Sequence, residues 1–250
     1  MPQLPAIITM KSLILRFVRR FGYEIINVSG HQEYDQVTPT ATYSPWNVDE
    51  QFKTVYQAIR ANTLVDRYKC YELWKLVEQS AKLEGALIEV GVWRGGSGAL
   101  IAQRARQCGI QDPVYLCDTY TGIVKAGEND PDYRGGEHAD TSVQIVEKLV
   151  QGLGISNVKI LQGIFPDQSA HRVDAPRFRF CHVDVDVYQS SKEVTQWVWD
   201  RLVVGGIVAY DDYGFKGLEG VRKFVEEQRM EPDRIVIHNL NGHAIVIKIR

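Results

Sequence analysis

The stretch ALIEVGVWRGGSGALIAQRARQC, residues 86–108, decides the fold. It opens with a short apolar run typical of a buried strand, turns through four glycines between residues 91 and 98, and continues as a helix from residue 97. Glycine is favoured where a chain must turn tightly or where a ligand approaches the backbone. By itself, such a turn is a weak signal for a binding site, because many glycine-rich turns between a strand and a helix serve packing alone.

The same alternation of strand and helix continues beyond this stretch. Further strands are expected at PVYLCD (113–118), VKILQG (158–163), FRFCHVDV (178–185) and GIVAYDD (206–212), with helices at 97–108, 141–153, 191–202 and 218–229. Buried strands alternating with helices predict a doubly wound α/β fold with a mostly parallel sheet. Residues 234–238 and 244–249 read as two strands joined by the turn NLNGH, so the last strand should be antiparallel.

The first third of the chain differs from the rest. Residues 30–47 are polar and rich in turn formers, whereas residues 48–61 and 65–83 carry apolar residues at helical spacing. An amphipathic helix is expected over residues 7–17. We therefore expect one structural domain, with an N-terminal helical or lid segment over 1–84 and a core over 85–250.

Composition excludes several classes of protein. The chain has 250 residues, of which 44% are hydrophobic, and 29 Lys plus Arg balance 31 Asp plus Glu, so it lacks the basic excess of a nucleic-acid binder. No apolar run reaches 18 residues, and no membrane span or membrane partner is expected. The four cysteines form no CxxC pair or metal-ligand spacing, which is typical of reduced thiols in a cytoplasmic protein.

An acidic residue follows the glycine turn at the distance that nucleotide-type ligands require. Asp118 ends the next strand 22 residues after Gly96 (118 − 96 = 22), where a carboxylate can accept hydrogen bonds from ribose hydroxyls. The turn lacks the full G-x-G-x-x-G spacing, because Gly95 is the first glycine after Gly91. Glu89, inside the strand, would repel a diphosphate, which argues against NAD.

Four carboxylates end two other strands of the predicted sheet. Asp184 and Asp186 lie two apart and face the same way, and Asp211 and Asp212 end the strand expected beside them. Four carboxylates at one edge repel one another unless a cation is present, and oxygen ligands select magnesium or calcium. The alternative, a set of helix caps and solvated strand ends, fits one Asp better than four.

Several motifs, taken in order, resemble the macrocin and mycinamicin sugar O-methyltransferases and their aminocoumarin relatives. These are EVGVWRGGS (89–97), DTYTG (118–122), GIFPD (163–167), HVDVDVY (182–188) and DDY (211–213), and the resemblance covers roughly residue 63 to the C-terminus. It implies a Rossmann-like class I methyltransferase fold, S-adenosylmethionine, Mg²⁺, and homo-oligomers in which N-terminal elements help to close the site.

The resemblance also implies roles for individual residues. Asp184, Asp211 and Asp212 would hold the metal, and Asp186 would be the general base. The positions that match the family's cofactor site are Thr63, Glu89, Gly91, Trp93, Ser97, Asp118 and Phe165. Among these, Glu89 would face the amino end of S-adenosylmethionine, Phe165 the adenine and Thr63 the methionine end.

The expected activity is therefore methyl transfer to a hydroxyl of a small natural-product acceptor, a deoxysugar of a macrolide or similar antibiotic. The ion would lower the pKa of the attacking hydroxyl and Asp186 would take its proton. A phenol or catechol acceptor, phosphoryl or glycosyl transfer through the D-x-D motif, and a non-catalytic relative remain alternatives. His138 is open between a role at the acceptor and a solvated loop, and His182 is expected in the core or behind the site.

Overall fold

The computed structural model describes residues 14, 17–18, 20–23, 25, 33–37 and 40–250. The chain divides into two compact units, Met1–Thr40 and Ala41–Arg250. The helix expected over residues 7–17 falls almost wholly outside the described residues. The second unit includes part of the segment expected as a lid, because residues 41–84 belong to the same compact unit as the core.

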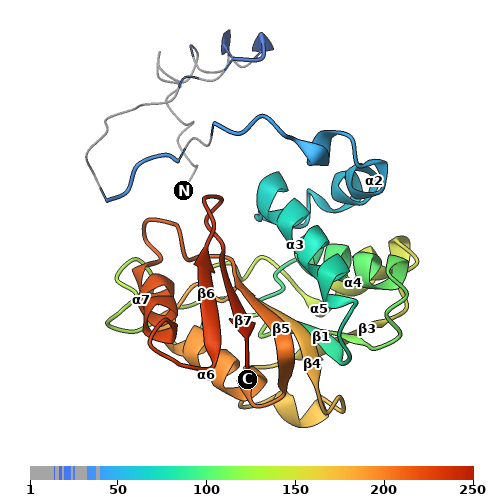
Figure 1. The fold of residues 1–250 in the computed structure, drawn as a ribbon, viewed down its shortest axis with the longest axis vertical. Coiled ribbons are helices and arrows are strands. Elements are labelled where there is room, and N and C mark those ends of the chain that lie inside the picture. The colour runs from blue at the N-terminus through green and yellow to red at the C-terminus, as the bar shows by residue number, and fades with distance from the viewer. Residues whose placement is uncertain (1–13, 15–16, 19, 24, 26–32, 38–39) are drawn as a thin grey trace, which may run out of the picture. The chain divides into compact units, whose positions relative to one another are not determined.

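One seven-stranded sheet organises the described part of the second unit, in the order β3-β2-β1-β4-β5-β7-β6 (Figure 1). The strands are β1 (Ala86–Val90), β2 (Val114–Asp118), β3 (Val158–Gln162), β4 (Phe178–Val183), β5 (Leu202–Tyr210), β6 (Arg234–His238) and β7 (Ala244–Lys248). Strands β1 to β5 are parallel, and β7 is antiparallel to both of its neighbours. The predicted doubly wound sheet with an antiparallel C-terminal strand is confirmed.

Helices cover both faces of the sheet, as the continuous burial of the parallel strands requires. They are α2 (Glu50–Ile59), α3 (Arg67–Ser80), α4 (Gly96–Gln107), α5 (Val143–Gly152), α6 (Tyr188–Trp199) and α7 (Glu219–Gln228), with short 3₁₀ turns η1 (Pro45–Asn47) and η2 (Ala170–Arg172). Helices α2, α3, α4 and α5 pack against one face of the sheet and form a first hydrophobic core with it. Helices α6 and α7 form a second core with the other face. Helices α2 and α3 contribute fully buried side chains, among them Phe52 and Trp74.

Two glycines allow the turn after β1 to pack against its neighbours. Gly91 has φ +89°, and an added Cβ would overlap the backbone carbonyl of Asp184 at the end of β4. A Cβ on Gly98, in the first turn of α4, would overlap the carboxylate of Glu89. The turn can therefore lie directly over the ends of β1 and β4.

The strand order reverses between β1 and β4, which places their carboxyl ends at the switch point of the sheet. The ends of β2, β4 and β5 carry Asp118, Asp184 and Asp211 to this same edge. In open α/β sheets, ligands bind in the crevice at this position. The fold thus brings together the residues that the sequence places far apart.

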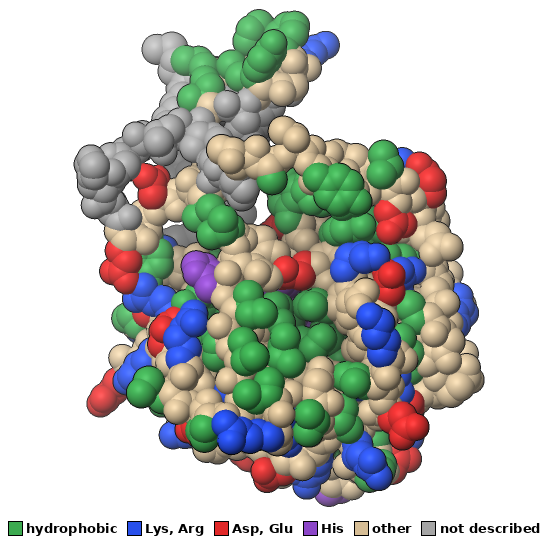
Figure 2. Space-filling model, in the orientation of Figure 1, with side chains coloured by type: hydrophobic (Ala, Val, Ile, Leu, Met, Phe, Trp, Pro, Cys, Tyr) green, Lys and Arg blue, Asp and Glu red, His purple; other side chains and the backbone are tan. Residues whose placement is uncertain are grey.

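The outer strand β6 leaves apolar side chains exposed. Ile235 and Ile237 are 50% and 42% exposed, and Figure 2 shows hydrophobic side chains gathered over this part of the sheet.

Within the described residues, no helix is long and apolar enough to cross a membrane. The four cysteines are free, and three of them are buried.

Candidate cofactor and metal site

A cavity of about 400 Å³ opens at the carboxyl edge of the parallel strands. Ten of the eleven residues that the sequence singles out line it: Thr63, Gly91, Trp93, Ser97, Asp118, Phe165, Asp184, Asp186, Asp211 and Asp212. The eleventh, Glu89, lies behind the turn. The cavity therefore joins the glycine turn on one side to the carboxylates of β4 and β5 on the other.

Asp118 holds the glycine turn in place through hydrogen bonds to its backbone. Its Oδ2 accepts hydrogen bonds from the backbone N–H groups of Val92 (2.7 Å) and Trp93 (2.8 Å), and its Oδ1 accepts one from Tyr120 (2.6 Å). An ionised carboxylate has about four acceptor positions, so three bonds leave room for a ligand hydroxyl. The residue thus has a structural role that the spacing argument did not foresee, and it also faces the cavity.

Glu89 is fully buried and does not line the cavity. Burial raises the pKa of its carboxyl, and the hydrogen bond with His182 opposes that rise. Glu89 Oε1 and His182 Nδ1 are 2.9 Å apart. Its expected contact with the amino end of a cofactor stays a prediction, whereas His182 is fully buried, as expected.

The carboxylates of Asp184, Asp186 and Asp212 form one group, with oxygens that all lie within 4.8 Å of one another. Removal from water, followed by the negative charge of neighbouring carboxylates, raises the pKa of Asp184 and of Asp212 well above the usual range. Asp212 Oδ2 is buried and has no hydrogen-bond partner among the described residues. The three carboxylates thus offer several oxygen ligands with little positive charge nearby, which fits a divalent cation such as Mg²⁺.

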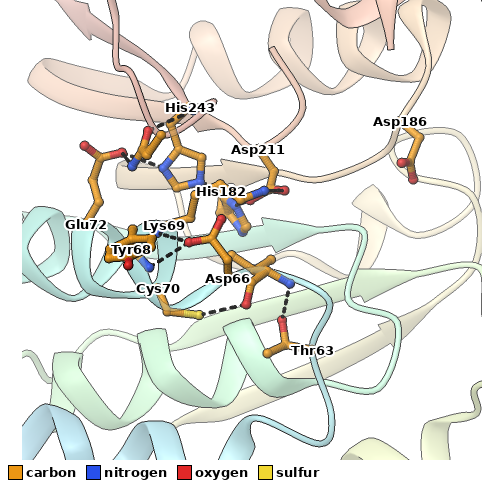
Figure 3. Close-up of polar contacts among 12 residues, drawn as sticks. Thr63, Asp66, Tyr68, Lys69, Cys70, Glu72, His182, Asp186, Asp211 and His243 are labelled. Atoms are coloured by element: carbon orange, nitrogen blue, oxygen red, sulfur yellow. Dashed lines mark hydrogen bonds and ion pairs between the residues drawn. The ribbon is translucent and has the colours of Figure 1, made fainter. Parts of the chain in front are cut away.

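Asp211 belongs to a second group, with His182 and His243 (Figure 3). Its Oδ2 forms an ion pair with Lys69, and its Oδ1 lies 3.0 Å from His243 Nε2 and 3.7 Å from His182 Nε2. Burial opposes the charge of Asp211, but the two histidines and Lys69 hold its pKa well below the usual range. The predicted metal set of Asp184, Asp211 and Asp212 is therefore divided between two groups, and Asp186 joins Asp184 and Asp212 in the first of them.

His182 lies between Glu89, behind the glycine turn, and Asp211, at the end of β5. Burial disfavours its charge, yet the contacts with Asp211 and Glu89 outweigh that cost and raise the pKa of the imidazole to about 10. The ring thus lies between two buried carboxylates, hydrogen-bonded through Nδ1 to Glu89 and with Nε2 3.7 Å from Asp211.

The loop between β2 and α5 covers the carboxylate side of the cavity. Tyr133 donates a hydrogen bond of 2.8 Å from its hydroxyl to Asp186 Oδ1, and His138 lines the cavity. Asp130, 3% exposed, accepts hydrogen bonds from the backbone N–H groups of Gly127 (3.0 Å) and Tyr188 (2.8 Å), which anchors the loop to the start of α6. His138 is an exposed loop residue that also lines the cavity, so both alternatives for it stay open.

Sequence reasoning missed four residues of this site: Lys69, Glu72, Tyr133 and His243. No local motif marks them, because each joins the site through a contact with a residue at least 32 positions away in the chain. The only available signal was the Asn-Gly turn, which predicted the hairpin that carries His243. That turn gave no indication that it reaches the carboxylates.

The fold and the cavity define a class: a Rossmann-like class I methyltransferase sheet with a binding site at its switch point. The family model described as Macrocin-O-methyltransferase (TylF) matches residues 31–241. The chain belongs to this family.

Two curated relatives resemble the chain over part of its length. An 8-demethyl-8-(2,3-dimethoxy-alpha-L-rhamnosyl)-tetracenomycin-C 4'-O-methyltransferase of Streptomyces olivaceus is 28% identical over 155 residues, 58% of this chain and 58% of the relative. A demethyldecarbamoylnovobiocin O-methyltransferase of Streptomyces niveus is 27% identical over 165 residues, 61% of this chain and 63% of the relative. The chain thus matches less than two thirds of the length of either relative.

Solved structures share the fold at lower identity. The O-methyltransferase NovP superposes with a TM-score of 0.67 at 22% identity, over 76% of this chain and 83% of that one. CalS11, a calicheamicin methyltransferase, gives a TM-score of 0.59 at 14% identity, over 84% of this chain and 99% of that one. At these identities the likeness extends to the fold alone.

Proposed function

We propose that this protein is an S-adenosylmethionine- and Mg²⁺-dependent O-methyltransferase that acts on a hydroxyl of a small natural product, a deoxysugar of an antibiotic or similar metabolite. The observation that carries the proposal is the single cavity in which the glycine turn and Asp118 face four carboxylates. Family membership and the O-methyltransferase activity of the two relatives support methyl transfer over phosphoryl or glycosyl transfer.

The cofactor half of the proposal rests on the turn after β1. Trp93, in the turn, and Ser97, in the first turn of α4, line the cavity. Asp118 would accept a ribose hydroxyl with its remaining acceptor position, and Phe165, 5% exposed, offers an apolar wall for the adenine. Thr63 lines the cavity beside the turn, where the methionine end would lie.

The metal half rests on the unbalanced charge of the carboxylates. Burial, and then the charge of neighbouring carboxylates, raises the pKa values of Asp184 and Asp212, and we assign these two residues with Asp211 as metal ligands. Asp186 is the proposed general base. Because Asp186 groups with this pair whereas Asp211 groups with two histidines, the two assignments need a direct test.

The cofactor would supply a sulfonium-bound methyl group, and the ion would lower the pKa of the acceptor hydroxyl that it binds. The chain's own residues would then do the rest. Asp186 would remove the hydroxyl proton, and the hydrogen bond from Tyr133 to Oδ1 would hold the carboxylate in place. The loop that carries Tyr133 and His138 would limit access of water and shape the acceptor site.

The test is turnover of S-adenosylmethionine with a panel of vicinal-diol sugars and catechols, with Mg²⁺ and with EDTA. We expect methylated sugar only when Mg²⁺ is present, and a preference for catechols would favour the phenol alternative. Asp186→Asn should abolish turnover while Mg²⁺ still binds, whereas Asp211→Asn should weaken Mg²⁺ binding. If Asp186→Asn weakened Mg²⁺ binding and Asp211→Asn abolished turnover without weakening it, Asp186 would be the metal ligand and Asp211 the base.

From the family resemblance we also propose a homo-oligomer located in the cytoplasm, with residues 1–84 contributing a lid. Size-exclusion chromatography with light scattering measures the oligomeric state. A monomer at micromolar concentration would refute the first part of this proposal.

A further inference from the structure

A chain of three buried or half-buried side chains links helix α3 to the carboxylate edge. Glu72 Oε2 lies 2.6 Å from His243 Nδ1, and His243 Nε2 lies 3.0 Å from Asp211 Oδ1 (Figure 3). His243 is fully buried, and the side chain of Asp211 is 6% exposed. The imidazole therefore has a carboxylate oxygen at each nitrogen, and its ring plane is fixed from both ends.

Glu72 is itself held by the turn of the β6–β7 hairpin. Its Oε1 accepts a hydrogen bond from Asn239 Nδ2, and its Oε2 accepts one of 3.0 Å from Asn241 Nδ2. Asn241 Oδ1 in turn accepts a hydrogen bond of 3.0 Å from the backbone N–H of His243. Apart from Asp211, the hydrogen-bond partners that the structure gives His243 thus come from α3 or from the hairpin turn.

Asp211 differs from the other three carboxylates because both of its oxygens have partners. Lys69 pairs with Oδ2 and His243 with Oδ1, whereas Asp212 Oδ2 has no hydrogen-bond partner among the described side chains and backbone. A carboxylate oxygen has two acceptor positions, so these contacts orient Asp211 without using all of its capacity. Groups that hydrogen-bond to a metal-binding carboxylate set its direction and hence the affinity of the site.

We propose that Glu72 and His243 are positioning residues for the divalent cation: through the Glu72–His243–Asp211 chain, they fix the direction in which Asp211 presents its carboxylate. This inference rests on the proposed function, in which Asp211 is a metal ligand. It assigns a role in metal binding to the C-terminal hairpin, which lies beyond the strands that bear the carboxylates. The competing explanation is that these contacts only fasten the hairpin to α3.

The two explanations differ in what Asn239 should do. Asn239→Ala removes a bond between the hairpin and Glu72 but leaves the contacts of His243 in place. The two carboxylate oxygens of Glu72 accept hydrogen bonds from His243 and from both asparagines. Glu72→Gln keeps the shape of the side chain but replaces one of these oxygens by an N–H₂ group, which cannot accept a hydrogen bond. His243→Leu removes the contact with Asp211 altogether.

The experiment is calorimetric titration of the full-length protein with MgCl₂ in the presence of saturating S-adenosylhomocysteine. We expect Mg²⁺ to bind about 10-fold more weakly to Glu72→Gln and up to ~100-fold more weakly to His243→Leu. Asn239→Ala and the distant surface variant His171→Gln should stay within about twofold of wild type, and S-adenosylhomocysteine should bind all four variants with unchanged affinity. Thermal unfolding of each variant, measured in EDTA, reports on folding separately.

Three results would overturn the inference. Unchanged Mg²⁺ affinity in Glu72→Gln, on a wild type that binds Mg²⁺, would show that the chain does not act on the metal, and would leave the proposed function intact. An equal loss in Asn239→Ala and Glu72→Gln would favour the fastening explanation. A wild type that binds S-adenosylhomocysteine but no Mg²⁺ would overturn the inference together with the metal half of the proposed function.

Discussion

At the scale of single residues, the contact between Tyr133 and Asp186 has the clearest functional consequence. Asp186 has φ 62°, an uncommon backbone conformation for a residue other than glycine, and Tyr133 holds its Oδ1 at 2.8 Å. Strained residues held by surrounding contacts are frequent at active sites. The position of the carboxylate thus depends on a hydroxyl from a different loop.

Replacing Tyr133 by Phe removes this hydrogen bond and keeps the ring. A hydrogen bond to a charged group contributes about 1.5–3 kcal/mol, so kcat should fall roughly 10- to 100-fold if the orientation of Asp186 limits proton removal. The KM for S-adenosylmethionine should not change, because the cofactor half of the cavity is untouched. Steady-state kinetics measure both quantities, and a raised KM with normal kcat would assign Tyr133 to binding instead.

Asp212 provides a second test at this scale, through stability in the absence of metal. Asp212→Asn removes a negative charge from a crowded group in which the pKa of Asp212 is raised well above normal by burial and by its neighbours. The variant should unfold at a higher temperature than wild type in EDTA, by ~2–4 °C for each kcal/mol gained. Adding Mg²⁺ should stabilise wild type but not the variant. Equal stabilisation of both proteins by Mg²⁺ would remove Asp212 from the metal site.

At the scale of elements, the turn after β1 fixes the geometry of the cofactor half. Gly91 combines a positive φ with direct contact to the backbone of Asp184, so the ends of β1 and β4 meet only if residue 91 has no side chain. Asp118 then fastens the turn to β2 through the backbone of Val92 and Trp93. Three strand ends therefore depend on one short segment.

Gly91→Ala should accordingly prevent folding, because the added Cβ overlaps backbone atoms that cannot move without separating the strands. Gly109→Ala is the matched control: Gly109 has φ +75° but no atom within 4 Å of an added Cβ. It should cost only the conformational strain of roughly 1–2 kcal/mol. Soluble yield and thermal unfolding compare the two variants, and a folded Gly91→Ala protein near wild-type stability would refute this view of the turn.

The sequence was most informative about elements and least informative about contacts between them. The sheet, its antiparallel strand and the edge that collects Asp118, Asp184 and Asp211 follow from apolar periodicity and from the direction of parallel strands. The contacts of Asp211 with Lys69 and His243 could not be predicted, because they depend on how α3 and the hairpin pack against β5. The packing of distant elements against one another does not change the spacing of residues within each element, so the sequence pattern does not reveal it.

At the scale of the whole molecule, the compact unit that holds the site begins at Ala41. Phe52 and Ile59 of α2 and Leu73 and Trp74 of α3 are fully buried in the core on one face of the sheet. A segment that only covered the site would not contribute to that core. Helices α2 and α3 are therefore structural parts of the domain, and Lys69 of α3 also lines the cavity.

This view predicts different outcomes for two truncations. A protein that begins at Ala41 should remain folded, with an unfolding temperature close to that of the full chain, because the described sheet and both cores lie within it. A protein that begins at Gly85 should not fold, since it lacks the buried side chains of α2 and α3. Circular dichroism during heating distinguishes the two, and a stable fragment 85–250 would mean that the N-terminal helices are a removable lid.

The central claim is that one cavity binds S-adenosylmethionine against the turn after β1. The most direct measurement is calorimetric titration of the full-length protein with S-adenosylhomocysteine, for wild type and for Asp118→Ala, with circular dichroism to verify that both are folded. We predict saturable binding of one equivalent to wild type and no measurable binding to the folded variant. Absence of binding to wild type would contradict the methyltransferase assignment and would direct attention to phosphate esters and nucleotide sugars as ligands.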